Sequence, residues 1–137
     1  MTTPDPTAQQ IDELLSFLPR LYGDGFVPVK AWHGGAKEDG TMTLPWPEYH
    51  ELVPQFFAAA AAECWRDYQY DMTQAWQMLA DEPLVKQASL AQIKTMLTYC
   101  VRGERFSDGH WGMMIEEGHI RRLLERLAVL QENQGNG

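Results

Sequence analysis

The chain has 137 residues, 45% of them hydrophobic and 11% aromatic, which suffices to bury a core in one domain and excludes a disordered protein. Its formal net charge is −8. The acidic excess lies entirely in residues 1–81, whereas residues 82–137 carry equal numbers of acidic and basic side chains. This distribution disfavours contact of the front half with nucleic acid or an anionic membrane.

Targeting, redox and metal signals point to a cytoplasmic protein. The first ten residues lack the basic and apolar runs of a secretory signal, and no apolar run approaches the roughly 18 residues that cross a membrane. Cys64 and Cys100 lie among apolar residues of expected helices, so we expect two reduced, buried thiols. The histidines show no HxxxH or HExxH spacing, and we expect no metal and no cofactor.

Amphipathic helices account for most of the chain. Thr7, Asp71 and Ser89 are good N-caps, and each precedes apolar residues at the spacing of a buried helix face. The first of these helices should end near Tyr22, and the one after Ser89 should be long and end at Gly103. A short helix and a last amphipathic helix after a glycine break should follow.

One β-hairpin is expected in the front half. Residues 26–32 and 41–44 have strand composition and flank a glycine-rich loop. Because a lone hairpin is marginal in water, one face should pack on helices. Residues 45–47 (Pro-Trp-Pro) should then separate the hairpin from a short helix at residues 48–52, and Pro54 should restart a helix that runs to Trp65.

The segment Arg102–Trp111, here called the corner, concentrates more ionisable side chains than any other stretch. In a structural interpretation, Arg102 and Arg105 donate hydrogen bonds to the free carbonyls at the end of the long helix. Ser107 or Asp108 then caps the next helix. Such contacts would tie two helix ends together and would need no ligand.

Two functional interpretations of the corner remain open beside the structural one. Arg102 and Arg105 could form an anion-binding notch with the next helix start, and His110 or Glu104 would then act as an acid or base. Alternatively, the arginines and Trp111 would anchor a protein partner. Either interpretation makes the corner a binding site without assigning a catalytic residue.

Trp32 and His33, followed by two glycines, form a second candidate binding cluster. A glycine loop beside an aromatic ring can cover a ligand, but a hairpin loop that needs positive φ angles explains the same glycines. The break at Gly118 and the helix after it also have the layout of a helix-turn-helix. That segment is electrically neutral, so binding of nucleic acid is not favoured.

Seven short motifs are spread over most of the chain: Trp46-Pro47-Glu48-Tyr49, the turn around Trp65, Asp67 and Tyr68, Leu97-Thr98-Tyr99, Arg102-Gly103-Glu104-Arg105-Phe106, Asp108-Gly109-His110, Gly118-His119-Ile120 and Leu124-Glu125-Arg126-Leu127. Together they resemble the bacterial family catalogued as domain of unknown function 6508. The resemblance covers about residues 11–130. It implies a small bacterial or phage-borne protein and transfers no catalytic role.

We therefore expect an α+β, predominantly α-helical single domain of residues 1–137, with five to six helices packed against one β-hairpin and loose tails at 1–6 and 132–137. The expected function is that of an acidic accessory protein that binds a protein partner, such as an inhibitor or decoy from a mobile element. The alternatives are an enzyme or sensor that binds an anionic small molecule at the corner, and a helix-turn-helix-like nucleic-acid binder. The sequence leans against an enzyme. The candidate binding residues are Arg102, Glu104, Arg105, Asp108, His110, Trp111, Trp32 and His33.

Overall fold

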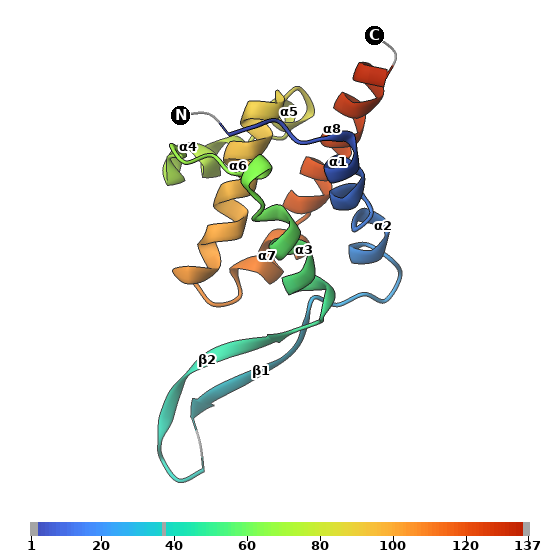
Figure 1. Ribbon diagram of the computed structural model, residues 1–137. Helices are drawn as coiled ribbons and strands as arrows, with labels where there is room; N and C mark the ends of the chain where they lie inside the picture. Colours follow the sequence, from blue (N-terminus) through green and yellow to red (C-terminus); the bar gives the residue numbers. More distant parts are fainter. Residues whose placement is uncertain (1–2, 37, 136–137) are drawn as a thin grey trace.

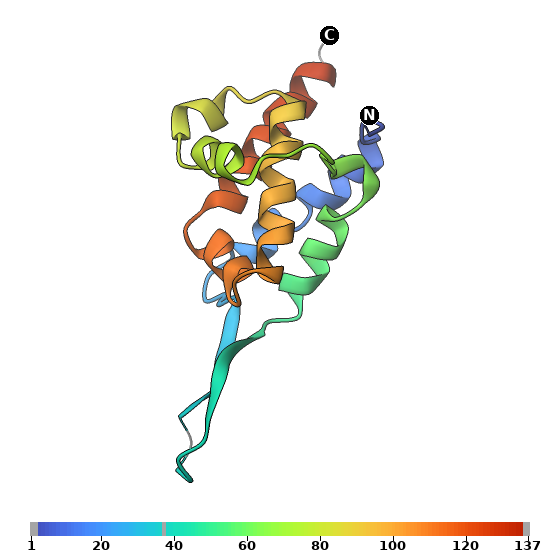
Figure 2. The ribbon, with the colours of Figure 1, turned by 90° about the vertical axis from the view of Figure 1, so that its left-hand side faces the viewer.

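The protein folds into a helical body from which a two-stranded antiparallel hairpin projects (Figure 1). The computed structural model describes residues 3–36 and 38–135. The fold is α+β and predominantly helical, as predicted, and a second view shows the hairpin extending from one end of the body (Figure 2). The elements are α1 (Ala8–Leu15), α2 (Leu18–Leu21), β1 (Val29–Ala36), β2 (Met42–Tyr49), α3 (Leu52–Ala60), α4 (Met72–Leu79), α5 (Glu82–Lys86), α6 (Leu90–Arg102), α7 (His110–Glu116) and α8 (His119–Gly135), with 3₁₀ turns at Glu63–Trp65 and Gly103–Arg105.

The capping residues start their helices where the sequence places them. Thr7 and Ser89 each form a capping box, in which the hydroxyl accepts a hydrogen bond from the N–H three residues later and the Gln side chain there accepts from the cap's own N–H. The Asp71 side chain caps α4 by accepting a hydrogen bond from the Gln74 N–H, without the second bond of a capping box. The first helix is divided, however. Pro19 cannot donate to a carbonyl four residues earlier, so α1 ends at Leu15 and a separate turn, α2, follows.

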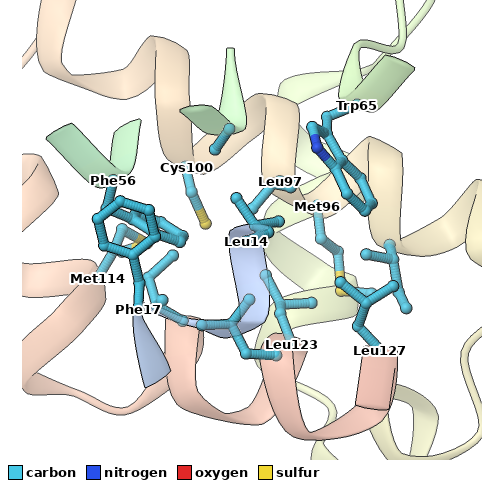
Figure 3. Close-up of a cluster of buried hydrophobic side chains, with 14 of the residues drawn as sticks. Leu14, Phe17, Phe56, Trp65, Met96, Leu97, Cys100, Met114, Leu123 and Leu127 are labelled. Carbon is cyan, nitrogen blue, oxygen red and sulfur yellow. The ribbon is translucent and has the colours of Figure 1, made fainter. Parts of the chain in front are cut away.

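The core is organised around α6. Ile93, Met96, Leu97 and Cys100 lie on one face of α6 and are each at most 1% exposed. The neighbouring helices α1, α3 and α8 supply leucine and phenylalanine side chains to the same cluster (Figure 3). A fully buried side chain of this kind contributes roughly 1.5–3 kcal/mol, so the helical body rather than the hairpin stabilises the fold.

Relative to the sequence prediction, β1 begins and ends closer to the tip of the hairpin, and β2 extends farther toward its base. β1 continues through the glycines to Ala36, and β2 continues to Tyr49. The segment 45–47 therefore lies within β2 instead of separating two elements, and the short helix expected at residues 48–52 is replaced by the end of this strand. Irregular pairing occurs next to Lys30 and Gly34, where the strands change register.

The two prolines fit within β2 because neither occupies a position that must donate a hydrogen bond to β1. At the base of the hairpin, the N–H of His50 donates to the carbonyl of Pro28 and therefore faces β1. Successive N–H groups of a strand alternate between its two edges, so the nitrogen of Pro47, three residues away, faces outward. Pro45 lies at the register shift between Trp46 and Thr43 and has no partner on β1. Their missing N–H groups cost no hydrogen bond of the ladder, and Pro47 protects the outer edge against pairing with another strand.

The base of the hairpin packs on α7, whereas the outer part projects beyond the helices (Figure 1). A Cβ atom added to Gly112 would lie 2.8 Å from Val29 Cγ2, so only glycine permits this approach. Farther out, Met42 and Leu44 are 79% and 84% exposed. The expectation that one whole face of the hairpin packs on helices is therefore wrong for its outer half.

Pro54 lies inside α3 rather than at the start of a helix. It occupies the first turn, where a backbone N–H has no partner within the helix, so proline is tolerated there. α3 ends at Ala60, before the predicted end at Trp65. The chain then forms the 3₁₀ turn Glu63–Trp65, which turns the indole of Trp65 into the core (Figure 3).

Both expected tails are partly ordered. Lys94 is 7% exposed, and its ammonium donates to the Thr3 hydroxyl and the Pro4 carbonyl and lies 3.5 Å from an Asp5 carboxylate oxygen. At the other end, α8 continues to Gly135. Residues 1–2 and 136–137 of the expected tails lie outside the described residues.

Candidate binding site at the corner and the hairpin base

Glu104 connects the corner, α7 and the hairpin. One carboxylate oxygen accepts hydrogen bonds from the Trp111 N–H and the Tyr49 hydroxyl, both at 2.8 Å, and the other accepts from the Gly109 N–H at 3.1 Å. A carboxylate at the first N–H groups of a helix forms charge-assisted hydrogen bonds and meets the positive end of the helix dipole. Glu104 is thus fully engaged in holding three segments together.

This arrangement replaces the cap that the sequence predicts from Ser107 or Asp108. α7 begins after Gly109, whose φ of 92° is left-handed and whose lack of a side chain leaves the N-cap position without a side-chain acceptor. The carboxylate of Glu104, five residues earlier, supplies the acceptor instead. Ser107 and Asp108 are exposed, which leaves their side chains at the surface.

The two arginines do not tie down the end of α6 as the structural interpretation expects. Among the described residues, neither Arg102 nor Arg105 forms a hydrogen bond or an ion pair through its side chain. The Arg102 guanidinium lies 5.8 Å from the ring centroid of Tyr70, and its Nε is buried without a partner. Arg105 is exposed.

His110, expected as an acid or base of the corner, is buried at 5% exposure and packs against neighbouring residues. Its ring faces Gly103, where an added Cβ would lie 2.2 Å from Nε2, and it makes an edge contact with Tyr99 at 5.1 Å between ring centroids. Burial lowers the pKa of His110 by disfavouring the charged form. The neutral imidazole therefore fills a gap between α6 and α7.

The pKa of His119 is lowered as well, by burial and by the neighbouring Arg122. Both histidines thus bind protons more weakly in the folded than in the unfolded chain, so the free energy of unfolding should be constant above about pH 6.5 and fall as the pH decreases below it. Urea denaturation at a series of pH values measures this slope, to which each histidine contributes at most about 1.4 kcal/mol per pH unit. His110→Asn and His119→Gln should each reduce the slope, and an unchanged slope in both would contradict the assignment.

Trp111, expected as a docking anchor, is partly buried and packs against neighbouring elements of the protein. Its ring stacks on Phe57 with 4.7 Å between centroids and an interplanar angle of 7°, and its indole N–H donates to the Val101 carbonyl at 2.9 Å. The ring of Tyr49 adds a third aromatic contact. These contacts place Trp111 between α3, α6 and the hairpin base, where it supports the position of α7.

Trp32 and His33 lie on opposite faces of β1, as consecutive strand residues do. The indole of Trp32 covers Gly109, where an added Cβ would lie 2.7 Å from Cη2. His33 instead contacts the ring of Trp46 and lies 2.8 Å from a carboxylate oxygen of Glu48, within the hairpin. The structure therefore brings Trp32 to the corner and places His33 away from it.

A surface pocket of about 290 Å³ opens where Trp32 meets the corner. Its walls are β1 and the start of α7, and its lining includes Trp32, Asp108, Met113 and Glu116. Lysine and arginine are absent from the residues that line it. The pocket between Trp32 and the corner is thus apolar and acidic, unlike the cationic notch expected from Arg102 and Arg105.

Sequence reasoning missed Tyr49 and Gly112, which join the hairpin to α7, as well as the pocket-lining residues Val29, Met113 and Glu116. The Tyr49 hydroxyl donates to Glu104 and accepts from the Gly112 N–H at 3.4 Å, so it connects the hairpin to α7. Burial and the hydrogen bond to Glu104 raise the pKa of Tyr49, which keeps the hydroxyl protonated as a donor.

Within the described ranges, no helix is long and apolar enough to cross a membrane. Groups of three or more His, Cys, Asp or Glu side chains that could hold a metal ion are likewise absent from residues 3–36 and 38–135. Cys64 and Cys100 are both buried and form no disulfide.

A family model described as "Family of unknown function (DUF6508)" matches residues 6–133. The chain belongs to this family. The match confirms the resemblance carried by the motifs around the corner and α8, and it includes the hairpin and the pocket described above. Membership of DUF6508 assigns no activity to the chain, because the family description names none. Neither the curated proteins nor the solved structures include a match to it.

Proposed function

We propose that the protein is a small binding protein that recognises a protein partner through its projecting hairpin. The observation that carries this proposal is the exposure of large apolar side chains on the hairpin. They are Trp32, Met42, Leu44 and Trp46, each at least half exposed. Apolar side chains gathered on one projecting element are typical of surfaces that become buried on association.

The construction of the hairpin supports the same proposal. A two-stranded sheet is marginally stable in water, and the outer half of this one gains no packing from the helices. Its base is nevertheless fixed to α7 through Val29, Tyr49 and Trp32. A segment that contributes little to folding but is held in a defined direction is suited to contact another molecule.

Charge suggests what kind of protein the partner is. The acidic excess lies in residues 1–81, and although the hairpin residues 29–49 themselves carry only three acidic against two basic side chains, the front half as a whole would attract a partner with a basic surface. An inhibitor or decoy that acts in the cytoplasm and derives from a bacterial mobile element or phage fits such a role. Both the acidic front half and the absence of a catalytic motif support this finer proposal.

The two alternatives receive less support from the geometry. An enzyme acting on an anion at the corner would need Glu104 or His110 free, but Glu104 accepts three hydrogen bonds and His110 is buried. A nucleic-acid binder would need a continuous basic stripe on α8. Arg121 there pairs with Glu125, and Arg126 donates to the Ala88 carbonyl.

The test compares two variants with matched chemistry. Met42→Ser/Leu44→Ser alters the hairpin, and Met72→Ser/Val129→Ser alters exposed apolar side chains of the helical body. Immobilised wild type should capture a partner from lysate of the source organism. The hairpin variant should capture about 5- to 30-fold less, which corresponds to losing one or two contact residues, and the body variant should capture as much as wild type.

Both variants must first show the circular dichroism and urea midpoint of the wild type, since exposed substitutions rarely change stability by more than about 0.5 kcal/mol. Equal capture by the hairpin variant and the wild type would refute the proposed role of the hairpin. Loss of capture in the body variant alone would move the interface to the helices.

A further inference from the structure

The pocket between Trp32 and α7 has the chemistry of a receptor for one cationic side chain. We infer that it binds an arginine side chain of the partner protein, with the guanidinium over the Trp32 indole and between the carboxylates of Asp108 and Glu116. This inference rests on the proposed function, because the arginine belongs to the protein that the hairpin recognises. Beyond the proposed function, the inference specifies where one arginine of the partner binds and which groups contact it.

The walls of the pocket match the two parts of an arginine side chain. Val29 and Met113 provide apolar surface for the three methylene groups of the stem. The indole of Trp32 is 56% exposed, so much of the ring stays accessible although one edge covers Gly109. A guanidinium is planar, weakly hydrated and stacks on an indole more readily than an ammonium does.

The charges around the pocket favour a cation and disfavour an anion. Asp108 and Glu116 line it, both are exposed, and neither forms a hydrogen bond or ion pair through its side chain with any described residue. Glu104, in contrast, is occupied by Tyr49 and two backbone N–H groups. The two free carboxylates are thus available as acceptors. The lining contains no lysine or arginine, and burial lowers the pKa of His110, which also lines the pocket, so its neutral form is favoured.

The size of the pocket agrees with a single side chain. A volume of about 290 Å³ is at the lower end of the range for small-molecule sites and too small for a drug-sized ligand to be enclosed. Trp32, Met113 and Glu116 of its lining are exposed, so the pocket is accessible from solvent. A side chain presented by a partner on the hairpin could therefore reach it.

The test uses the full chain labelled with ¹⁵N and two short peptides, acetyl-Gly-Arg-Gly-amide and acetyl-Gly-citrulline-Gly-amide. Citrulline has the shape of arginine without its charge. The arginine peptide should shift the Trp32 indole N–H signal, which is identified by its loss in Trp32→Phe, and the amide signals of Gly109 and Gly112. Saturation is expected in the millimolar range, as for a single exposed contact, and the citrulline peptide should produce no saturable shift.

Matched variants separate the pocket from general acidity. Asp108→Asn/Glu116→Gln should weaken binding of the arginine peptide about fivefold or more, whereas Glu13→Gln/Asp24→Asn, with the same change in net charge, should stay within about twofold. Equal binding of both peptides, or equal weakening by both variants, would overturn the inference. A shift that leaves Trp32 unaffected would do so as well.

The outcome is distinguishable from failure of the proposed function. If partner capture depends on Met42 and Leu44 while the arginine peptide does not bind, the hairpin function stands and the pocket inference fails. If the peptide binds as described while the hairpin variant still captures the partner, the pocket inference stands and the role of the hairpin fails.

Discussion

Replacing Glu104 by alanine is expected to lower the free energy of unfolding by about 2–4 kcal/mol. The substitution leaves the N–H groups of Gly109 and Trp111 and the hydroxyl of Tyr49 without their acceptor. All three hydrogen bonds are partly buried, so water replaces the carboxylate only incompletely. Urea denaturation followed by circular dichroism measures the loss.

Two neighbouring substitutions serve as controls for this prediction. Asp108→Ala and Arg105→Ala remove charges from the same corner, but both side chains are exposed and without hydrogen bonds to described residues. Each should change the free energy of unfolding by less than about 0.5 kcal/mol. A loss for Asp108→Ala as large as that for Glu104→Ala would show that the corner is stabilised by its overall charge and not by the three hydrogen bonds.

A double-mutant cycle connects the same carboxylate to the hairpin. If Tyr49 acts through Glu104, the effect of Glu104→Ala/Tyr49→Phe should be smaller than the sum of the two single effects by about 0.5–3 kcal/mol. Hydrogen exchange at the amide of Gly112 should accelerate in each single variant, because Tyr49 holds the first turn of α7 against the hairpin base. Additive effects would mean that the hairpin and the corner are stabilised independently.

The helical body could be predicted from the sequence because its signals are local. Thr7, Asp71 and Ser89 precede amphipathic runs, and each starts its helix as expected. The periodic apolar residues of α6 form the buried face of the central helix. Such signals depend on residues that are close in the sequence and not on the rest of the fold, so the helices that they predict are found in the structure.

The strands were harder to delimit because little of the hairpin is buried. A strand with one buried face shows alternating polarity, but Met42 to Trp46 are all exposed and so carry no such pattern. Pro45 and Pro47 then favoured an interruption. Whether these prolines are compatible with β2 depends on which edge of that strand faces β1. The hydrogen bond from His50 to Pro28 sets this orientation, and the local sequence does not indicate it.

The corner was recognisable as the densest cluster, yet the roles within it follow from long-range contacts. The sequence assigned the helix cap to Ser107 or Asp108, whereas the left-handed Gly109 transfers that role to Glu104. The meeting of Trp32 with Gly109 joins residues from separate elements, and no local pattern indicates it. The acidic pocket they form was therefore beyond the reach of sequence reasoning.

Gly103→Ala is expected to lower the free energy of unfolding by about 1–3 kcal/mol. Gly103 has φ −62° and ψ −25°, which are helical values that alanine adopts more readily than glycine, by up to about 1 kcal/mol. Any loss must therefore come from contacts of the new methyl group. The added Cβ would lie 2.2 Å from Nε2 of the buried His110, and the ring has to move to admit it.

The decisive comparison removes the imidazole as well. His110→Ala alone should destabilise the protein by leaving a cavity between α6 and α7. In Gly103→Ala/His110→Ala the methyl group enters that space without a clash, so the double variant should be at least as stable as His110→Ala. Additive losses in urea denaturation would show that Gly103 is required for a reason other than the imidazole, whereas the expected recovery would establish that these two residues set the distance between α6 and α7.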